Sequence, residues 1–345
     1  MIFASAAFGL LARGATNMSS VVFSHLVLGI GAGLVALVAA ISIDYHYFRR
    51  YAPYIYGAAL FITALVFIPH VGSCMKGGCR WINIGGFSLQ PSEILKIATI
   101  LMAATYFAAM RAEITSWKYG LGGFLGILAG PVVLLILQPD LGTLGVICFS
   151  VLSIYWAAGA RVRDLAVVAA IGVLALGALV VLRPYVRDRV MTFVHPAQGQ
   201  QVESYQLKQS LIAIGSGRLL GRGFGQGIQK FTYLPEPMGD SIFAVASEEL
   251  GFVGAVTIVM LFLFFALRGL IVATKIGEPF PAFVTIGIST YLACEAFINI
   301  ASMLGVAPLT GIPLTFISQG GSAMLFSLAS AGILLNVSRC RVLNR

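Results

Sequence analysis

Acidic residues gather in one short stretch of the sequence, YLPEPMGDSIFAVASEELGF, at residues 233 to 252. It holds Glu236, Asp240, Glu248 and Glu249, although the 345-residue chain has only 13 Asp and Glu. Asp240 follows a turn rich in Pro and Gly and immediately precedes an apolar run, which places its carboxylate beside the start of a helix. Such a carboxylate can act as a general base or can simply cap the helix, and the position alone does not separate these interpretations.

Three further charged residues interrupt apolar runs, where an ionisable group costs at least about 2.5 to 3.5 kcal/mol at mid-bilayer. Glu93 and Lys96 in LQPSEILK are three residues apart, so they share one face of a helix. They form either a charge pair that lines a polar cavity, or a carboxylate at a helix N-terminus and a lysine that snorkels to the interface. Asp140 in LILQPDLGT either lines the same kind of cavity or caps the next helix.

Glu248 and Glu249 occupy consecutive helix positions, so their side chains point about 100° apart. We therefore expect one of them to be structural, and we assign Glu249 to the polar cavity with Glu93 and Asp140. Glu295 also lies inside an apolar run.

Basic residues alternate with glycines in SYQLKQSLIAIGSGRLLGRGFGQGIQK, residues 204 to 230. The beginning of this stretch has the spacing of an amphipathic helix on a membrane surface. In the second half, backbone N–H groups beside Arg218, Arg222 and Lys230 can cradle a phosphate, although a flexible loop explains the glycines equally well. No βαβ pattern surrounds them, which excludes a dinucleotide-binding fold.

The composition shows which elements must position these residues. With 59% hydrophobic residues, 10% charged residues and a mean hydropathy of +0.93, the chain is a polytopic membrane protein. We predict an all-α transmembrane bundle with nine full spans, because the apolar runs are too long for barrel strands. The spans are residues 21 to 43, 53 to 69, 92 to 110, 120 to 137, 141 to 159, 164 to 182, 241 to 269, 280 to 302 and 312 to 337. Met1 to Ala12 is expected to be the second half of a further, truncated first helix.

The distribution of Lys and Arg predicts the orientation. Basic residues concentrate in one set of short loops and at the C-terminus: Arg49, Arg50, Arg111, Lys118, Arg161, Arg163, Arg268, Lys275, Arg339, Arg341 and Arg345. By the positive-inside rule these residues face the cytoplasm. Two long loops, about residues 70 to 91 and 183 to 240, then lie outside it. The net charge of +9 is spread over many helix ends, which excludes a nucleic-acid-binding patch.

The cysteines contain one informative pair. CMKGGC places Cys74 and Cys79 in one outside loop, where a disulfide is an open possibility in an oxidising compartment. The other three cysteines are scattered and are expected to pack as small apolar residues. No CxxC pair or His cluster predicts a zinc site.

Six motifs together resemble those of the SEDS family (shape, elongation, division and sporulation). They are WINIGGFSLQPSEILK, QPDLGT, SYQLKQSLIAIGSG, IQKFTYLPE, DSIFAVASEELGFVG and PLTGIPLTFISQGGSAMLFSLASAGILLNVSR, and they cover nearly the whole chain. Within the family, QKFTYLPE and LTGIPLTFISQGGS are more similar to the division branch, FtsW, than to the elongation branch, RodA.

The resemblance implies one integral-membrane SEDS domain over residues 1 to 345, with ten helices in the cell inner (plasma) membrane. It implies a peptidoglycan glycosyltransferase that polymerises lipid II at the outer membrane face during cell division. The implied partners are lipid II, the undecaprenyl-pyrophosphate-linked glycan, a cognate class B penicillin-binding protein (a transpeptidase) and other divisome proteins.

The resemblance also assigns individual residues. The essential aspartate of the family matches Asp240, its QPSE..K acid and lysine match Glu93 and Lys96, and its QPDLGT aspartate matches Asp140. The basic residues before its F..P element match Arg187 and Arg189. This chain departs from the family pattern beside the aspartate, where Met238 and Gly239 replace the usual His-Thr, and it has Gln319 where Tyr is more common.

Glycan transfer from a lipid pyrophosphate needs a base for the attacking sugar hydroxyl and positive charge for the departing pyrophosphate. We expect Asp240 to be the base. Lys96, Arg187, Arg189, Arg218 and Lys230 are the candidates for binding the pyrophosphate. No cofactor is expected to bind tightly, although Glu93 and Asp240 are candidate ligands for a divalent Mg or Mn ion. Two other functions stay open: a lipid II flippase, which would use charges deeper in the spans, and a scaffold that docks partners.

Overall fold

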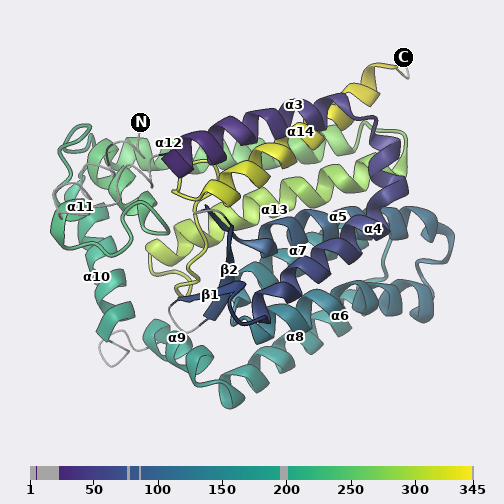
Figure 1. Ribbon diagram of the computed structural model, residues 1–345, viewed down its shortest axis with the longest axis horizontal. Helices are drawn as coiled ribbons and strands as arrows, with labels where there is room; N and C mark the ends of the chain where they lie inside the picture. The colour runs from purple at the N-terminus through teal and green to yellow at the C-terminus, as the bar shows by residue number, and fades with distance from the viewer. Residues whose placement is uncertain (1–4, 6–22, 76–77, 85–86, 195–200, 344–345) are drawn as a thin grey trace. The chain divides into compact units, whose positions relative to one another are not determined.

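A computed structural model of the protein describes residue 5 and residues 23–75, 78–84, 87–194 and 201–343 (Figure 1). These residues are mainly helical, as predicted. The expected half-helix at Met1 to Ala12 lies outside them, apart from Ser5.

Nine apolar helices correspond to the nine predicted spans. In chain order they are the π-helix Ser24–Gly31 with α3 (Ala32–Ser42), α4 (Tyr45–Ala64), α5 (Pro91–Ala109), the π-helix Trp117–Leu121 with α6 (Gly122–Leu137), α7 (Leu141–Ala157), α8 (Val162–Leu182), α12 (Ile242–Ala273), α13 (Pro279–Met303) and α14 (Gly321–Leu343). In the described part of the chain, eight of these segments are long and apolar enough to cross a membrane, and α7 is a shorter apolar helix. The chain is therefore a multi-pass membrane protein.

Three short helices lie between α8 and α12: α9 (Pro184–Val194), α10 (Gln201–Ser216) and α11 (Gln229–Thr232). The predicted amphipathic helix corresponds to α10. Single 3-10 turns follow α4 at Leu65–Phe67 and α5 at Arg111–Glu113.

Two span boundaries differ from the predicted ones. The last helix begins at Gly321 instead of residue 312, because the preceding segment contains Pro308, Pro313 and Gly311, whose φ is +69°. The second begins at Tyr45 instead of residue 53, where the Asp44 side chain accepts a hydrogen bond from the His46 backbone N–H at 2.9 Å. Hydropathy missed this beginning because the early turns of α4 carry the exposed Arg49 and Arg50.

A small antiparallel sheet lies where the sequence predicted only a loop. Its strands are β1 (Gly72–Met75), β2 (Gly78–Ile84) and β3 (Phe87–Leu89), in the order β1-β2-β3. The register places Cys74 opposite Cys79, and Cys79 is disulfide-bonded. This arrangement fits the predicted bridge between the two cysteines.

The chain groups into two compact units. The first comprises Met1–Phe23, Ala166–Leu263 and Glu295–Gly320, and the second comprises Ser24–Leu165, Phe264–Cys294 and Gly321–Arg345. The prediction of one integral-membrane domain over residues 1 to 345 stays a prediction. The boundaries fall next to or within α8, α12 and α13, so the two units contain parts of the same helices.

In the second unit, α3 packs along α14, while α4 and α7 pack against α5 (Figure 1). Helix α13 approaches α5 and α7 closely at Gly287, where an added Cβ would lie 2.6 Å from Ile100 and 2.7 Å from Ile154. The close approach explains why this position has no side chain.

In the first unit, the first turns of α12 are buried. Ile242, Phe243 and Ala246 pack with Leu207 of α10 and Ile300 of α13. Helix α12 breaks at Gly251, whose φ of 68° and ψ of −167° are not helical. An added Cβ at Gly251 would lie 2.2 Å from the backbone N of Gly221, so the break lets a loop approach the helix axis.

Candidate active site

Asp240 lies at the end of a tight turn in the first unit. The backbone N–H groups of Gly239 and Ser241 both donate to the carbonyl of Glu236, which has a positive φ of 47°. The first helical bond of α12 runs from the N–H of Val245 to the carbonyl of Ser241, at 3.4 Å. Ser241 therefore occupies the capping position, and Asp240 precedes it by one residue.

The segment 306–320, between α13 and α14, holds this turn in place. Asn299 of α13 donates through Nδ2 to the carbonyl oxygens of Asp240, at 2.8 Å, and Ile312, at 2.7 Å. The Ser318 hydroxyl donates to the Gly239 carbonyl at 2.6 Å, and the Gln319 N–H donates to the Met238 carbonyl at 2.7 Å. The backbone around Asp240 is thus tied to a second segment about 60 residues or more away in sequence.

Met238 and Gly239, the two residues before Asp240, take part in these bonds through their backbone. Met238 is buried among Ala213, Leu234 and Val245, and it contributes a carbonyl to the contact with Gln319. Gly239 likewise contributes its carbonyl. Both residues therefore position the turn through their backbone carbonyls.

Arg189 comes to the same place from α9. Its Nη1 donates to the Thr310 carbonyl at 3.1 Å, and its guanidinium lies over the Tyr185 ring at 4.4 Å. A Cβ on Gly311 would lie 3.9 Å from Arg189 Nη2 and 3.9 Å from Asp240 Oδ2. The carboxylate and the guanidinium therefore both lie beside this glycine, which has no side chain to contact either of them.

Arg187 does not share this location. It is exposed, and on α9 it precedes Arg189 by two positions, so the two side chains point about 200° apart. The sequence named both arginines, and the structure brings one of them to Asp240.

Glu93 and Lys96 form a buried pair in the second unit. Lys96 Nζ donates to Glu93 Oε1 at 2.9 Å, and the ammonium also lies 4.8 Å from the centre of the Tyr291 ring. Both side chains are almost completely buried, so Lys96 does not snorkel out of the helix bundle. The Tyr291 face adds an interaction that the spacing of the two charges could not show.

Asp140 caps α7, and it joins two Gln-Pro corners of the second unit. Its carboxylate accepts hydrogen bonds from the Thr143 backbone N–H at 3.4 Å and from the Thr143 hydroxyl at 2.9 Å. Gln90, directly before α5, donates to the same carboxylate at 3.5 Å, and Arg80 of β2 lies 3.9 Å from it. Arg80 also donates to the carbonyls of Gln138 and Pro139.

Gln90 and Arg80 are functional candidates that were not predicted from the sequence patterns. The sequence contained a signal for Gln90, because QP occurs directly before Asp140 and, with Ser92 between, before Glu93. Arg80 carried no such signal, since its contact depends on the unexpected sheet.

Lys230 and Glu249 form a second buried pair, in the first unit. Lys230 Nζ donates to Glu249 Oε1 at 2.5 Å, to the Ser5 hydroxyl at 2.6 Å and to the Gly225 carbonyl at 3.0 Å. Glu249 Oε2 accepts from the Gly225 N–H at 3.1 Å. We predicted Lys230 as a phosphate ligand and Glu249 as a cavity residue, and in the structure the two side chains hold the glycine-rich loop against α12.

Glu248 binds the same loop with its own carboxylate. It accepts from the N–H of Ile228 at 2.9 Å and of Gln229 at 3.2 Å, and Arg222 lies 3.5 Å away. The Arg218 carbonyl accepts from the N–H of Phe252 at 2.8 Å, while the Arg218 side chain is exposed. The sequence predicted a structural role for one of the two glutamates, and in the structure both of them bind the loop.

No three His, Cys, Asp or Glu side chains come together as a metal site within the part of the chain that the structure describes. The predicted ligands Glu93 and Asp240 belong to different units, so their joint use stays a prediction. Mg²⁺ is commonly held by one or two carboxylates together with substrate phosphates, and such a site needs no three-residue cluster.

Comparison with known proteins settles the family. The family model described as cell cycle protein, which represents FtsW, RodA and SpoVE, matches residues 1–342. The chain belongs to the SEDS family. The resemblance seen in its motifs is therefore confirmed.

Relatives of this SEDS protein match over most of their own length. Stage V sporulation protein E of Bacillus subtilis is 38% identical over 309 residues, which cover 90% of this chain and 84% of the relative. A probable peptidoglycan glycosyltransferase FtsW of Geobacter sulfurreducens is 38% identical over 312 residues, covering 90% and 82%.

Solved SEDS structures share the fold. A chain from a peptidoglycan synthase complex, studied for its coordination of polymerization and crosslinking, matches with a TM-score of 0.78 at 27% identity, covering 99% of this chain and 96% of that chain. The rod shape determining protein RodA of Thermus thermophilus matches with a TM-score of 0.70 at 25% identity, covering 99% and 94%. The predicted all-α, SEDS-type transmembrane bundle is confirmed.

Proposed function

We propose that this SEDS protein is a peptidoglycan glycosyltransferase that polymerises lipid II into glycan strands during cell division. The observation that carries the proposal is that the Asp240 carboxylate and the Arg189 guanidinium both lie beside Gly311, each 3.9 Å from the position of an added Cβ. The names of the relatives, which include probable peptidoglycan glycosyltransferases FtsW, support the same reaction.

The two side chains suit the two charges of the reaction. Asp240 takes the proton of the attacking sugar hydroxyl, whose oxygen forms a bond to the anomeric carbon of the second sugar. The bond from that carbon to the lipid pyrophosphate breaks, and the electron pair leaves with the pyrophosphate oxygen. Arg189 provides positive charge for the departing anion, and a general base of this kind typically contributes about 10²- to 10⁴-fold.

Hydrogen bonds with the segment 306–320 help to hold Asp240 and Arg189 in position. Asn299, Ser318 and Gln319 hold the backbone of residues 238–240, so the carboxylate does not need to be ordered when the substrate binds. Arg189 is held by the Thr310 carbonyl of the same segment. Asn299 of α13 and the segment 306–320 therefore together position the base and the cation.

The remaining parts of the proposal rest on the family and the charge pattern. We place the protein in the cell inner membrane, with loops 70 to 91 and 183 to 240 outside and the C-terminus in the cytoplasm. We propose a class B penicillin-binding protein as its partner, because a structural neighbour comes from a peptidoglycan synthase complex. A divalent cation at Glu93 or Asp240 would neutralise pyrophosphate charge.

The test is polymerisation of lipid II by the purified protein with its partner. Asp240→Asn keeps the size of the side chain and removes its ability to accept a proton, so glycan synthesis should fall by about 10²-fold or more while partner binding persists. Glu236→Gln is the matched control, because Glu236 is an exposed acid in the same turn, and it should retain nearly the parental rate.

Two outcomes contradict the proposal. A properly expressed Asp240→Asn variant that synthesises glycan at nearly the parental rate excludes Asp240 as the base. Translocation of lipid II across vesicles, without any polymerisation by the parental protein, would indicate a flippase instead.

A further inference from the structure

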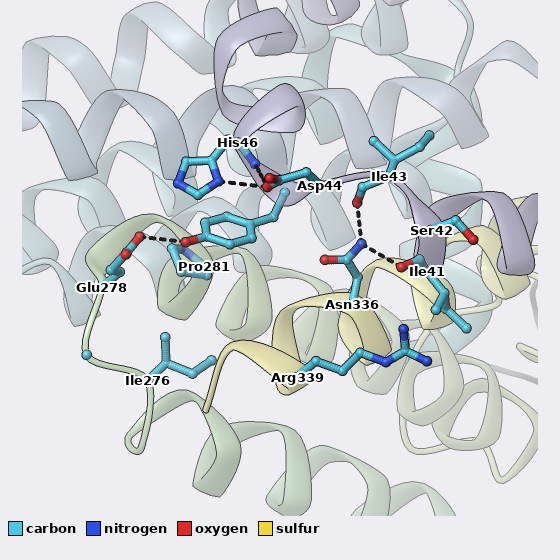
Figure 2. A pocket seen from close by; sticks show the side chains of 12 residues that line it. Ile41, Ser42, Ile43, Asp44, His46, Ile276, Glu278, Pro281, Asn336 and Arg339 are labelled. Atoms are coloured by element: carbon cyan, nitrogen blue, oxygen red, sulfur yellow. Dashed lines mark hydrogen bonds and ion pairs between the residues drawn. The ribbon is translucent and has the colours of Figure 1, made fainter. Parts of the chain in front are cut away.

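A cavity of about 380 Å³ lies in the second unit, and none of its lining residues is among the candidates for catalysis described above (Figure 2). Three segments line it: residues 41 to 46, from the end of α3 to the start of α4; residues 276 to 278 before α13, with Pro281 of its first turn; and Asn336 and Arg339 of α14. None of these residues has a part in the proposed glycan transfer.

The cavity lies where membrane-spanning helices end. Helix α3 ends at Ser42 and α4 begins at Tyr45, while α12 ends at Ala273 and α13 begins at Pro279. All of these belong to segments that are long and apolar enough to cross a membrane. The cavity therefore lies at the level where hydrocarbon gives way to headgroups and water.

Its wall is held by one buried amide. Asn336 Nδ2 donates to the carbonyls of Ala40 at 2.8 Å, Ile41 at 3.0 Å and Ile43, which fastens the α3–α4 connection to α14. A side-chain hydrogen bond joins the same connection to the segment before α13, since the Tyr45 hydroxyl donates to Glu278 Oε2 at 3.1 Å. The cavity is thus formed before any ligand arrives.

The residues that line the cavity include both acidic and basic side chains, at separate positions. Figure 2 shows Glu278 and the guanidinium of Arg339 on opposite sides of the view, with Asp44 and His46 above. Asp44 accepts hydrogen bonds from the backbone N–H of His46 at 2.9 Å and from its ring at 2.7 Å. These bonds lower the pKa of Asp44, so the carboxylate is ionised at neutral pH.

The charges and the apolar wall select among ligands. A purely anionic ligand would meet the carboxylates of Asp44 and Glu278, and a purely cationic one would meet Arg339. A ligand that carries an amine and a phosphate a few bonds apart satisfies both signs. Ile41, Ile43 and Ile276 add apolar surface on which an acyl chain can begin.

We propose that this cavity binds the headgroup of a zwitterionic phospholipid that has a primary amine, with the ammonium at Glu278 and Asp44 and the phosphate at Arg339. The site would fasten one lipid to the ends of α3, α4, α13 and α14. It is separate from the proposed glycan transfer, and its test does not need enzymatic activity.

The experiment measures lipid binding to the delipidated protein in detergent by native mass spectrometry. The two probes are phosphatidylethanolamine and phosphatidylglycerol with the same acyl chains, which differ in the headgroup amine. The proposal expects tighter binding of phosphatidylethanolamine, and expects Glu278→Gln and Arg339→Gln each to weaken it by about 2- to 5-fold, as for partly exposed ion pairs.

Matched controls separate this site from general surface charge. Glu113→Gln and Arg111→Gln change an exposed acid and an exposed base at the end of α5, away from the cavity lining, and should leave binding unchanged. Melting temperatures of all four variants should agree, which shows that the fold is retained. Soluble glycerophosphoethanolamine should compete only weakly, since it lacks the acyl chains.

The proposal is overturned by equal binding of the two lipids, by tighter binding of phosphatidylglycerol, or by equal losses in the cavity and control variants. Full competition by the soluble headgroup would also contradict it, because the site would then take a soluble amine phosphate and not a membrane lipid.

Discussion

Variants of the buried pair of Lys230 and Glu249 test whether these two residues stabilise the fold or take part in catalysis. The side chains are 0% and 2% exposed, and their charged atoms are 2.5 Å apart. Removing one partner of such a pair leaves an uncompensated buried charge, which costs about 3 to 5 kcal/mol. Replacing both partners with neutral groups is often close to neutral. The two single variants and the double variant should therefore behave non-additively.

We predict that Lys230→Met and Glu249→Gln each lower the melting temperature in detergent by about 10 °C, from the free energy above and the usual dependence of melting temperature on stability. The double variant should recover most of this loss. In that variant the introduced glutamine amide can still bond the Gly225 N–H and the Ser5 hydroxyl, which contact Glu249 in the parental protein.

Arg222→Gln is the matched control in the same loop. Arg222 is 37% exposed and 3.5 Å from Glu248, which keeps two backbone N–H partners of its own. A partly exposed pair of this kind contributes about 0 to 1 kcal/mol, so the variant should melt within a few degrees of the parent.

A lipid II polymerisation assay tests the alternative, in which Lys230 binds the pyrophosphate of the substrate. If Lys230 binds pyrophosphate, Lys230→Met should melt like the parent and lose activity, and Glu249→Gln should not restore it. That result would refute the structural interpretation of the pair.

Three further predictions concern other parts of the molecule. Gly311→Ala places a side chain at a φ of +69° and 3.9 Å from both Asp240 and Arg189, so polymerisation should fall while expression persists; an unchanged rate would place the reaction elsewhere. Asn336→Leu removes the donor to three carbonyls and should destabilise the protein by about 1 to 3 kcal/mol in thermal melts, and unaltered melting would contradict this. Cys74 and Cys79 should be bridged in the mature protein, with a loss of about 2 kcal/mol on reduction, whereas two free thiols by mass spectrometry under oxidising conditions would end the idea.

The sequence determined the number and positions of the spans well. Helix formation and membrane insertion depend on runs of about 20 apolar residues, and such runs are visible in a local window. The motifs added the family, and with it Asp240. Helix boundaries were predicted less accurately where prolines or charged residues acted against the hydropathy pattern. Examples are the proline-rich segment before α14 and the start of α4, which carries two arginines.

The tertiary structure decided which charged groups meet. Arg187 and Arg189 are equivalent in the sequence, and the rotation of α9 brings Arg189 to the segment that holds Asp240. Lys230 is one basic residue among several in its loop, and the break of α12 at Gly251 lets that loop reach Glu249.

The same holds for Asp140 and Arg80, which meet through a sheet that residues 70 to 91 did not reveal. Its strands are short and glycine pairs separate them in the sequence, so a local window shows little strand propensity. A charge inside a membrane protein must find a partner, but sequence spacing reports partners within one helix and is silent on those from other segments. Contacts between segments distant in the chain depend on how helices rotate and pack, and that is a property of the whole fold.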